Sequence, residues 1–318
     1  MKVRAVAWDE RKAAMNNLNL APNAPVKTDA LNISLVIGNQ PLAMAVKRGE
    51  VKSDLVNFNV IEVDPIHTSF KPMARERLYD VCEMAIVTFL MALDRGIELT
   101  LIPAVMLGRK QHPLFIHNAD RGRLTPDMLP GKRVGVRAYS QTTGTWIRGI
   151  LRDDYGVSFK DIDWVTFEGA HVPNFDDPAW VSRAPEDRNL LQMLIDGEID
   201  AAIAEKTDDP RLVPVIPDAD AAAARWSQRQ GFEPVNHLVV IRTELVRQHP
   251  WLAAEVYRML KASKAAAPST EVPDPMPFGV ETNRKAFDLI ARYAYEQGLV
   301  KRHYATNDIV DEALLGLN

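Results

Sequence analysis

Short apolar runs alternate with longer amphipathic segments along most of the chain. The apolar runs have the length of strands: LNISLVIG, VNFNVIEV, DVCEMAIV, LTLIPAVML, PLFIHN, RVGV, IDWVTF, IDAAIAE and HLVVIRTEL. The segments between them are predicted to be helical, and several end at a glycine: PLAMAVKRGE, FKPMARERLYD, LMALDRG, GTWIRGILRDDYG, RNLLQMLIDGE, ADAAAARWSQRQG, HPWLAAEVYRMLKASKAAA and NRKAFDLIARYAYEQG. This alternation predicts an α/β fold with largely parallel sheets.

Three segments lack a clear period: residues 1–30, read as an irregular arm, the loop 168–187, and the proline-rich stretch 268–277. Two other segments repeat one plan. RERLYDVCEMA and IDGEIDAAIAE each contain the end of a helix, a short turn, an aspartate and a strand of small residues. Such an echo suggests two lobes built in the same way.

Composition and charge restrict the classes of function. The chain has 318 residues with a net charge of −4, and it contains a single cysteine. The length suggests two domains or one large one, and the acidic balance argues against a nucleic-acid partner. One cysteine cannot form an intrachain disulfide. Neither an apolar signal core near MKVRAVAWDERKAAMNNL nor a run of 18 apolar residues is present, so we expect a cytoplasmic protein without a membrane partner.

A turn rich in hydroxyl and amide groups follows the strand RVGV. Ligands of parallel sheets bind beyond the carboxyl ends of the strands, and the next helix offers free N–H groups there. The turn therefore predicts an anion site, which one nearby arginine can reach. The residues are Ser140, Gln141, Thr142, Thr143 and Arg148. The alternative is that the hydroxyls only cap the helix. The glycine spacing matches no phosphate-binding loop, which favours a carboxylate.

The stretch GKRVGVRAYSQTTGTWIRGILRDDYGV resembles the 4,5-dihydroxyphthalate decarboxylase family, which has a strand, a Tyr-x-x-Thr turn and WIRGIL at this place. Further segments have counterparts in the same order: DVCEMAIVTFLMAL, LGRKQHPLFIHN, IDWVTF, LIDGEIDAAIAE, NHLVVIRTELVRQHPWLA and PFGVETNRKAF. The resemblance covers roughly residues 31–305. It implies the fold of type II periplasmic solute-binding proteins, in which two α/β lobes enclose a ligand cleft. We expect lobe one to comprise 1–118 and 236–318, and lobe two 119–235.

The resemblance also implies a reaction, the non-oxidative decarboxylation of an aromatic dicarboxylic acid such as 4,5-dihydroxyphthalate to protocatechuate and CO2. This chemistry needs an oriented carboxylate and a general acid for the ring carbon. Arg109, after the strand LTLIPAVML, is the expected carboxylate ligand, because its guanidinium binds carboxylates with two hydrogen bonds. His112, which matches the family's Arg-x-x-His, and His237 are the candidate acids, and Glu83 is expected to polarise a hydroxyl or to tune a histidine.

The sequence leaves other assignments open. Arg284 either binds the ligand or belongs to a helix start. No cofactor is predicted; a divalent metal on His112, His237 and Glu83 is the alternative, although no tight motif such as His-x-x-x-His supports it. The expected partner is a small aromatic carboxylate, and the sequence leaves open whether the chain forms a homo-oligomer. The alternative function is a solute-binding protein that captures a small carboxylate without chemistry.

Overall fold

The computed structural model describes residues 30–205, 207–267 and 274–318. The predicted N-terminal arm, apart from Ala30, therefore lies outside the described residues, as does most of the proline-rich stretch 268–277. None of the described helices combines the length and the apolar character that crossing a membrane requires.

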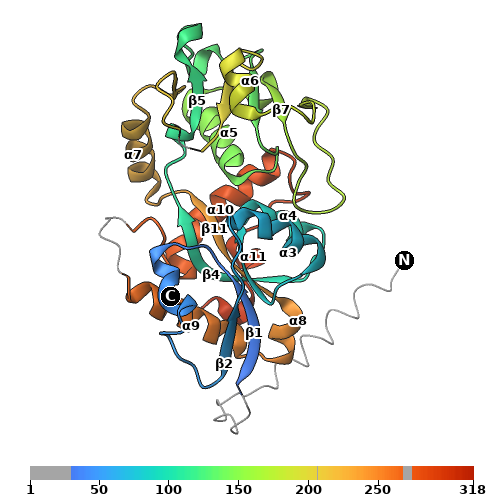
Figure 1. Ribbon diagram of the computed structural model, residues 1–318, viewed down its shortest axis with the longest axis vertical. Coiled ribbons are helices and arrows are strands. Elements are labelled where there is room, and N and C mark those ends of the chain that lie inside the picture. Colours follow the sequence, from blue (N-terminus) through green and yellow to red (C-terminus); the bar gives the residue numbers. More distant parts are fainter. Residues whose placement is uncertain (1–29, 206, 268–273) are drawn as a thin grey trace.

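Two sheets divide the molecule into two α/β lobes, one above the other in Figure 1. The lower sheet has the strand order β2-β1-β3-β11-β4, and the upper one β10-β5-β9-β6-β7-β8. The lower strands are β1 (Leu31–Val36), β2 (Val56–Val60), β3 (Val81–Ala85), β4 (Leu99–Gly108) and β11 (Val235–Arg242). The upper strands are β5 (Phe115–Asn118), β6 (Arg133–Val136), β7 (Asp163–Thr166), β8 (Val181–Arg183), β9 (Ala201–Ile203) and β10 (Leu212–Pro214).

Both sheets follow one plan. In each, a single strand runs against the others: β11 is antiparallel to β3 and β4, and β5 is antiparallel to β9 and β10. When the upper sheet is taken from its β8 edge and β8 is left out, its order β7-β6-β9-β5-β10 corresponds strand by strand to β2-β1-β3-β11-β4 in the lower sheet. The two segments with the same sequence plan supply β3 and β9, which occupy equivalent places, so the expectation of two similarly built lobes is confirmed.

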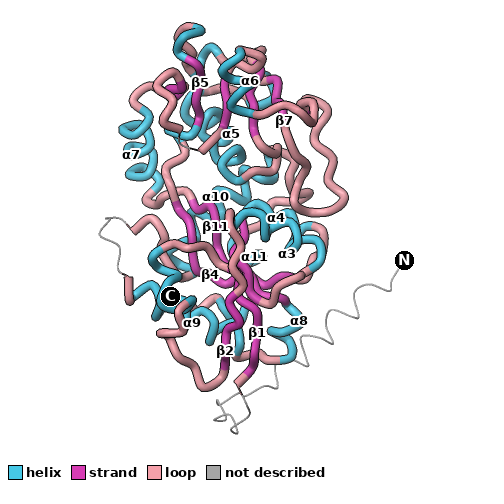
Figure 2. Tube along the Cα trace, viewed as in Figure 1, coloured by secondary structure: helices cyan, strands magenta, loops and turns pink. Residues whose placement is uncertain are grey.

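Helices cover the faces of both sheets and occupy the junction between them, as Figure 2 shows. Their bounds are α2 (Met44–Lys47), α3 (Phe70–Glu76), α4 (Ile86–Asp94), α5 (Thr142–Tyr155), α6 (Leu190–Asp196), α7 (Ala219–Gln230), α8 (Thr243–Gln248), α9 (Leu252–Ala265), α10 (Val280–Glu296) and α11 (Thr306–Ile309). Several strands and helices start or end a few residues from the predicted positions. In particular, the apolar run DVCEMAIV holds both the end of β3 and the start of α4.

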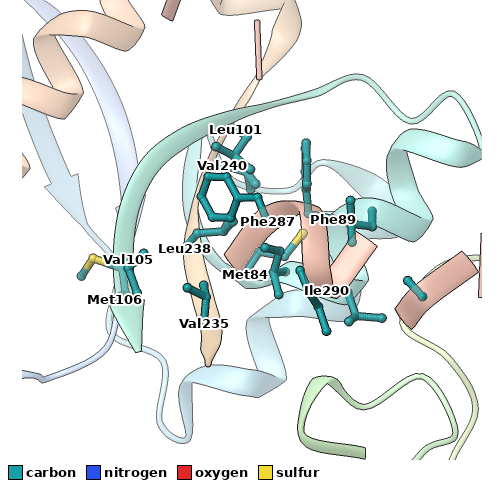
Figure 3. Packing of buried hydrophobic residues seen from close by; sticks show 14 of the residues in the cluster. Met84, Phe89, Leu101, Val105, Met106, Val235, Leu238, Val240, Phe287 and Ile290 are labelled. Carbon is teal, nitrogen blue, oxygen red and sulfur yellow. The ribbon is translucent and has the colours of Figure 1, made fainter. Parts of the chain in front are cut away.

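The core of the lower lobe forms where α4 and α10 pack on β3, β4 and β11. Figure 3 shows Met84, Leu238 and Val240 of the sheet facing Phe89 and Phe287 of the two helices, and all of these side chains are at most 1% exposed. Strands buried on both faces read as continuous apolar runs, which explains why β3, β4 and β11 were recognisable in the sequence.

The chain passes twice between the sheets. The first crossing lies between β4 and β5, at residues 109–114, and the second lies between α7 and β11, at residues 231–234. Strand β5 therefore belongs to the upper sheet, although the predicted division placed residues up to 118 in lobe one. Strand β11, which belongs to the lower sheet, begins at Val235.

Candidate active-site cavity

A cavity of about 680 Å³ lies between the lobes. Its walls come from strand ends, from the first turns of α4 and α5, and from loops of both lobes. This volume is in the range of small-molecule sites. The lining includes three histidines, three arginines and one glutamate: His67, His171, His237, Arg109, Arg137, Arg188 and Glu205.

His237 and Glu83 form a hydrogen-bonded pair at one wall. Strands β3 and β11 pair antiparallel with His237 opposite Ala85, so Glu83 lies diagonally across on the same face. The distance from His237 Nδ1 to Glu83 Oε1 is 2.7 Å. A register shift between β11 and β4 falls at His237, and bulges of this kind often re-aim a side chain beside a site. The geometry thus brings together two residues that the sequence analysis selects as site candidates.

Glu83 is fully buried and is held by the chain on its other side as well. The Gly38 N–H donates to Oε2 at 2.8 Å, and the Gln40 side-chain amide donates to Oε1 at 3.4 Å. A carboxylate accepts hydrogen bonds, and this contact uses Nδ1 of the imidazole. The Nε2 atom of His237 is then left to contact a molecule in the cavity.

The predicted anion loop lines the cavity with Ser140, Gln141, Thr142 and Thr143. The capping alternative is wrong, because α5 has no side-chain cap. Instead, Thr142 Oγ1 accepts a 3.3 Å hydrogen bond from Val87 N in the first turn of α4. The N-termini of α4 and α5 therefore meet at the cavity, one from each lobe. Their free N–H groups and positive dipole ends favour an anion there.

Arg109 lies at the cavity, but its guanidinium is already engaged. It contacts the Glu205 carboxylate with two hydrogen bonds of 2.5 and 2.9 Å and donates to Thr143 Oγ1 at 3.2 Å. The hydrogen bonds from Arg109 hold the pKa of Glu205 below its usual value. Glu205 follows β9, and in the sequence it only ends the predicted strand IDAAIAE. A ligand carboxylate would compete with Glu205 for the same guanidinium.

Three predicted site residues lie elsewhere. His112 is 1% exposed in a 3-10 turn between the lobes, does not line the cavity, and neither ring nitrogen has a partner among the described residues. Burial lowers its pKa to about 4. Arg284 pairs with Glu281 on the surface of α10. These positions correct the expectation that His112 and Arg284 contact the ligand.

Arg148 is the third corrected residue, because it lies beneath the anion loop rather than in the cavity. Its fully buried guanidinium donates to Gln297 Oε1 and to the Tyr139 carbonyl, both at 2.6 Å. No carboxylate among the described residues contacts it, and burial lowers its pKa to about 10. A buried cation below the first turn of α5 adds to the positive potential there.

The structure adds two histidines to the site that the sequence gave no reason to select. His67 lies in a 3-10 turn before α3, and His171 lies in the loop after β7. Burial is the first cause that lowers the pKa of each, in His171 to about 3. Nor does any group of three or more His, Cys, Asp or Glu side chains in the described part of the chain form a metal-binding cluster.

The two-lobed architecture with a cavity between the lobes is the fold of type II periplasmic binding proteins. The sulphonate-binding protein SsuA of Escherichia coli has a similar fold: the TM-score is 0.53, with 14% identity over 91% of this chain and 99% of that one. A ligand-binding component of an ABC-type import system from Staphylococcus aureus gives 0.51, with 9% identity over 91% and 98%. At these identities the likeness shows the fold alone.

Sequence comparison identifies the family. The chain is 30% identical over 257 residues to a 4,5-dihydroxyphthalate decarboxylase of Comamonas testosteroni, covering 74% of this chain and 76% of that protein. It is 28% identical over 219 residues to one of Pseudomonas putida, covering 64% and 83%. The chain belongs to the 4,5-dihydroxyphthalate decarboxylase family. No protein-family model matches it.

Proposed function

We propose that this protein catalyses the non-oxidative decarboxylation of an aromatic dicarboxylic acid such as 4,5-dihydroxyphthalate, giving protocatechuate and CO2. The proposal rests on one observation above all: His237, paired with the buried Glu83, lines the same cavity as the N-terminal turn of α5 in a member of this family. Decarboxylation requires both a proton donor and a place for the carboxylate, and candidates for both roles line this cavity.

The carboxylates of the substrate would be held at the N-terminus of α5. Ser140 and the first-turn N–H groups of α5 supply donors, and Arg109 supplies a charge once a ligand carboxylate replaces Glu205. Charge-assisted hydrogen bonds of this kind orient a carboxylate firmly. With a carboxylate fixed there, the ring of the substrate extends into the space between the two lobes.

His237 would deliver a proton from Nε2 to the ring carbon that loses CO2. The electron pair of the broken carbon–carbon bond returns to the ring, and solvent restores the proton on His237. Glu83 holds the ring of His237 in one orientation and stabilises the imidazolium form, the role that a buried carboxylate plays beside other catalytic histidines. Glu83 is therefore a positioning residue, and His237 is the catalytic acid.

The test is release of CO2 and protocatechuate from 4,5-dihydroxyphthalate by the purified protein. General acid catalysis contributes on the order of 10² to 10⁴ in rate, so His237→Gln should lower kcat by about 10²-fold or more. His303→Gln, at an exposed histidine, is the matched control and should keep full activity.

The alternative, capture of a carboxylate without chemistry, predicts a different result. The acid would then raise the melting temperature of the protein while no CO2 is released. If the acid is not turned over and does not raise the melting temperature, both functions are contradicted for this ligand. Full turnover by folded His237→Gln protein would contradict the assignment of the proton donor.

A further inference from the structure

His171 is fixed in place from the other lobe, although it lies in a loop without regular structure. The Arg75 guanidinium on α3 donates to the carbonyl of His171 at 2.9 Å and to those of Ala170 and Val172 at 3.1 and 3.3 Å. The Thr88 hydroxyl on α4 lies 2.9 Å from His171 Nδ1. Holding a loop in one conformation costs conformational entropy. The four contacts from α3 and α4 offset this cost and fix the position of His171.

The rings of His171 and His237 both line the cavity and both contact Phe70. The edge of Phe70 contacts both, with ring centroids 5.9 Å from His171 and 4.9 Å from His237. Because one aromatic ring contacts both imidazoles and both line one cavity, a single ligand in that cavity can reach His171 and His237. Nε2 of His171 has no hydrogen-bond partner among the described residues, so it is available to a molecule in the cavity.

The surroundings of His171 keep its ring uncharged. Burial is the main cause that holds its pKa far below the usual value, and the cationic side chains of Arg137 and Lys71 act in the same direction. A neutral imidazole offers one donor and one acceptor. It is therefore a weaker partner for a carboxylate than Arg109 or the N-terminus of α5, and a better partner for an uncharged hydroxyl group.

We propose that His171 binds a ring hydroxyl of the substrate and thereby selects hydroxylated aromatic acids over unsubstituted ones. This inference rests on the proposed function, whose substrate carries such hydroxyls. A hydroxyl satisfies Nε2 in either tautomer of His171, because it both donates and accepts, whereas a carboxylate satisfies only the N–H form. An acid without the hydroxyl leaves Nε2 facing the ligand without a partner, which costs binding energy.

The experiment compares the binding of protocatechuate and benzoate by titration calorimetry. These two acids differ only in ring hydroxyls, and neither is the substrate of the proposed reaction. The wild-type protein should bind protocatechuate at least about tenfold more tightly, as expected for one or more hydrogen bonds made to a buried polar group. In His171→Phe protein, which keeps an aromatic ring beside Phe70, the two affinities should be nearly equal, with benzoate binding unchanged.

Two further variants separate recognition from structure. Thr88→Val leaves the imidazole in place but removes its anchor, so it should reduce the preference only in part. His303→Phe, at an exposed position, should keep the wild-type preference. A His171→Phe protein that keeps the preference, or that loses affinity for both acids equally, would overturn the inference, as would a wild-type protein that does not distinguish the two acids.

The release of CO2 from 4,5-dihydroxyphthalate is measured on the same wild-type preparation. If protocatechuate is preferred and the preference depends on His171, but no CO2 is released, then the proposed function fails and the recognition of the hydroxyl stands. If CO2 is released and the preference does not depend on His171, the inference fails and the proposed function stands.

Discussion

The buried ring of His112 should make the protein progressively less stable in acid. In the folded protein its pKa is about 4, because burial disfavours the charged form; in the unfolded chain it returns to the ordinary value of 6.5. Between these values the unfolded state binds a proton that the folded state does not. The unfolding free energy therefore falls as the pH is lowered through this window, and it is fully retained above it.

The size of this effect follows from the shift. One pKa unit corresponds to about 1.4 kcal/mol, so the shift of His112 corresponds to a loss of roughly 3 kcal/mol between neutral pH and about pH 4. That is a large share of the ~5–15 kcal/mol that stabilises a typical domain. His112→Leu removes the titrating group, and it leaves no buried nitrogen without a partner. The variant should therefore lack this part of the acid destabilisation.

Urea unfolding of the wild-type and His112→Leu proteins across this pH range measures the effect. The difference between their unfolding free energies should change by about 3 kcal/mol from neutral pH to about pH 4. Other titrating groups, including His171, are common to both proteins and cancel in the difference. His303→Leu, at an exposed histidine, should run parallel to the wild type. A His112→Leu curve that is also parallel to the wild type would refute the reasoning.

Two other substitutions test the packing and the charge balance of the site. An added Cβ at Gly149 of α5 would lie 2.2 Å from the Tyr293 ring on α10, so Gly149→Ala should lower the unfolding free energy by about 1–3 kcal/mol in urea titrations. Gly316→Ala, where a Cβ meets nothing within 4 Å, should have little effect, and equal losses at both sites would contradict the argument. Glu205→Gln removes the charge that competes for Arg109, so benzoate should bind up to about tenfold more tightly in calorimetry at low salt. Glu62→Gln, at an exposed partner of Lys47, is the control, and unchanged or weaker benzoate binding by Glu205→Gln would show that Glu205 does not compete.

The sequence predicted the parts of the site that regular structure positions. The turn Ser140–Thr143 follows a recognisable buried strand, and strand ends of parallel sheets meet at one edge. Arg109 follows β4 in the same way. His237 and Glu83 lie on neighbouring strands whose apolar character was evident. In each case, a local hydrophobic pattern was enough to indicate where the polar side chain would be.

The remaining site residues depend on contacts that no local pattern encodes. His67 lies in a short link between a predicted strand and a predicted helix, and His171 lies in the loop 168–187, which has no period; Arg75 and Thr88 hold that loop from the other lobe. The errors have a similar cause. His112 is three residues from Arg109, but the intervening turn directs its ring into the junction between the lobes and away from the cavity.

Helix α5 links the anion loop to the rest of the protein, which explains how two lobes can form one site. Its first turn lines the cavity, while its middle is anchored to the other lobe: the Trp146 Nε1–H donates to the Val235 carbonyl at 2.8 Å, and Arg148 binds Gln297 beyond the end of α10. His237 lies two residues after Val235 on the same strand, β11. Because α5 is tied to the very strand that carries the proposed acid, the distance between the carboxylate site and His237 is set by buried contacts. A change that shifts α5, such as Gly149→Ala, should therefore lower kcat as well as stability, although Gly149 does not line the cavity.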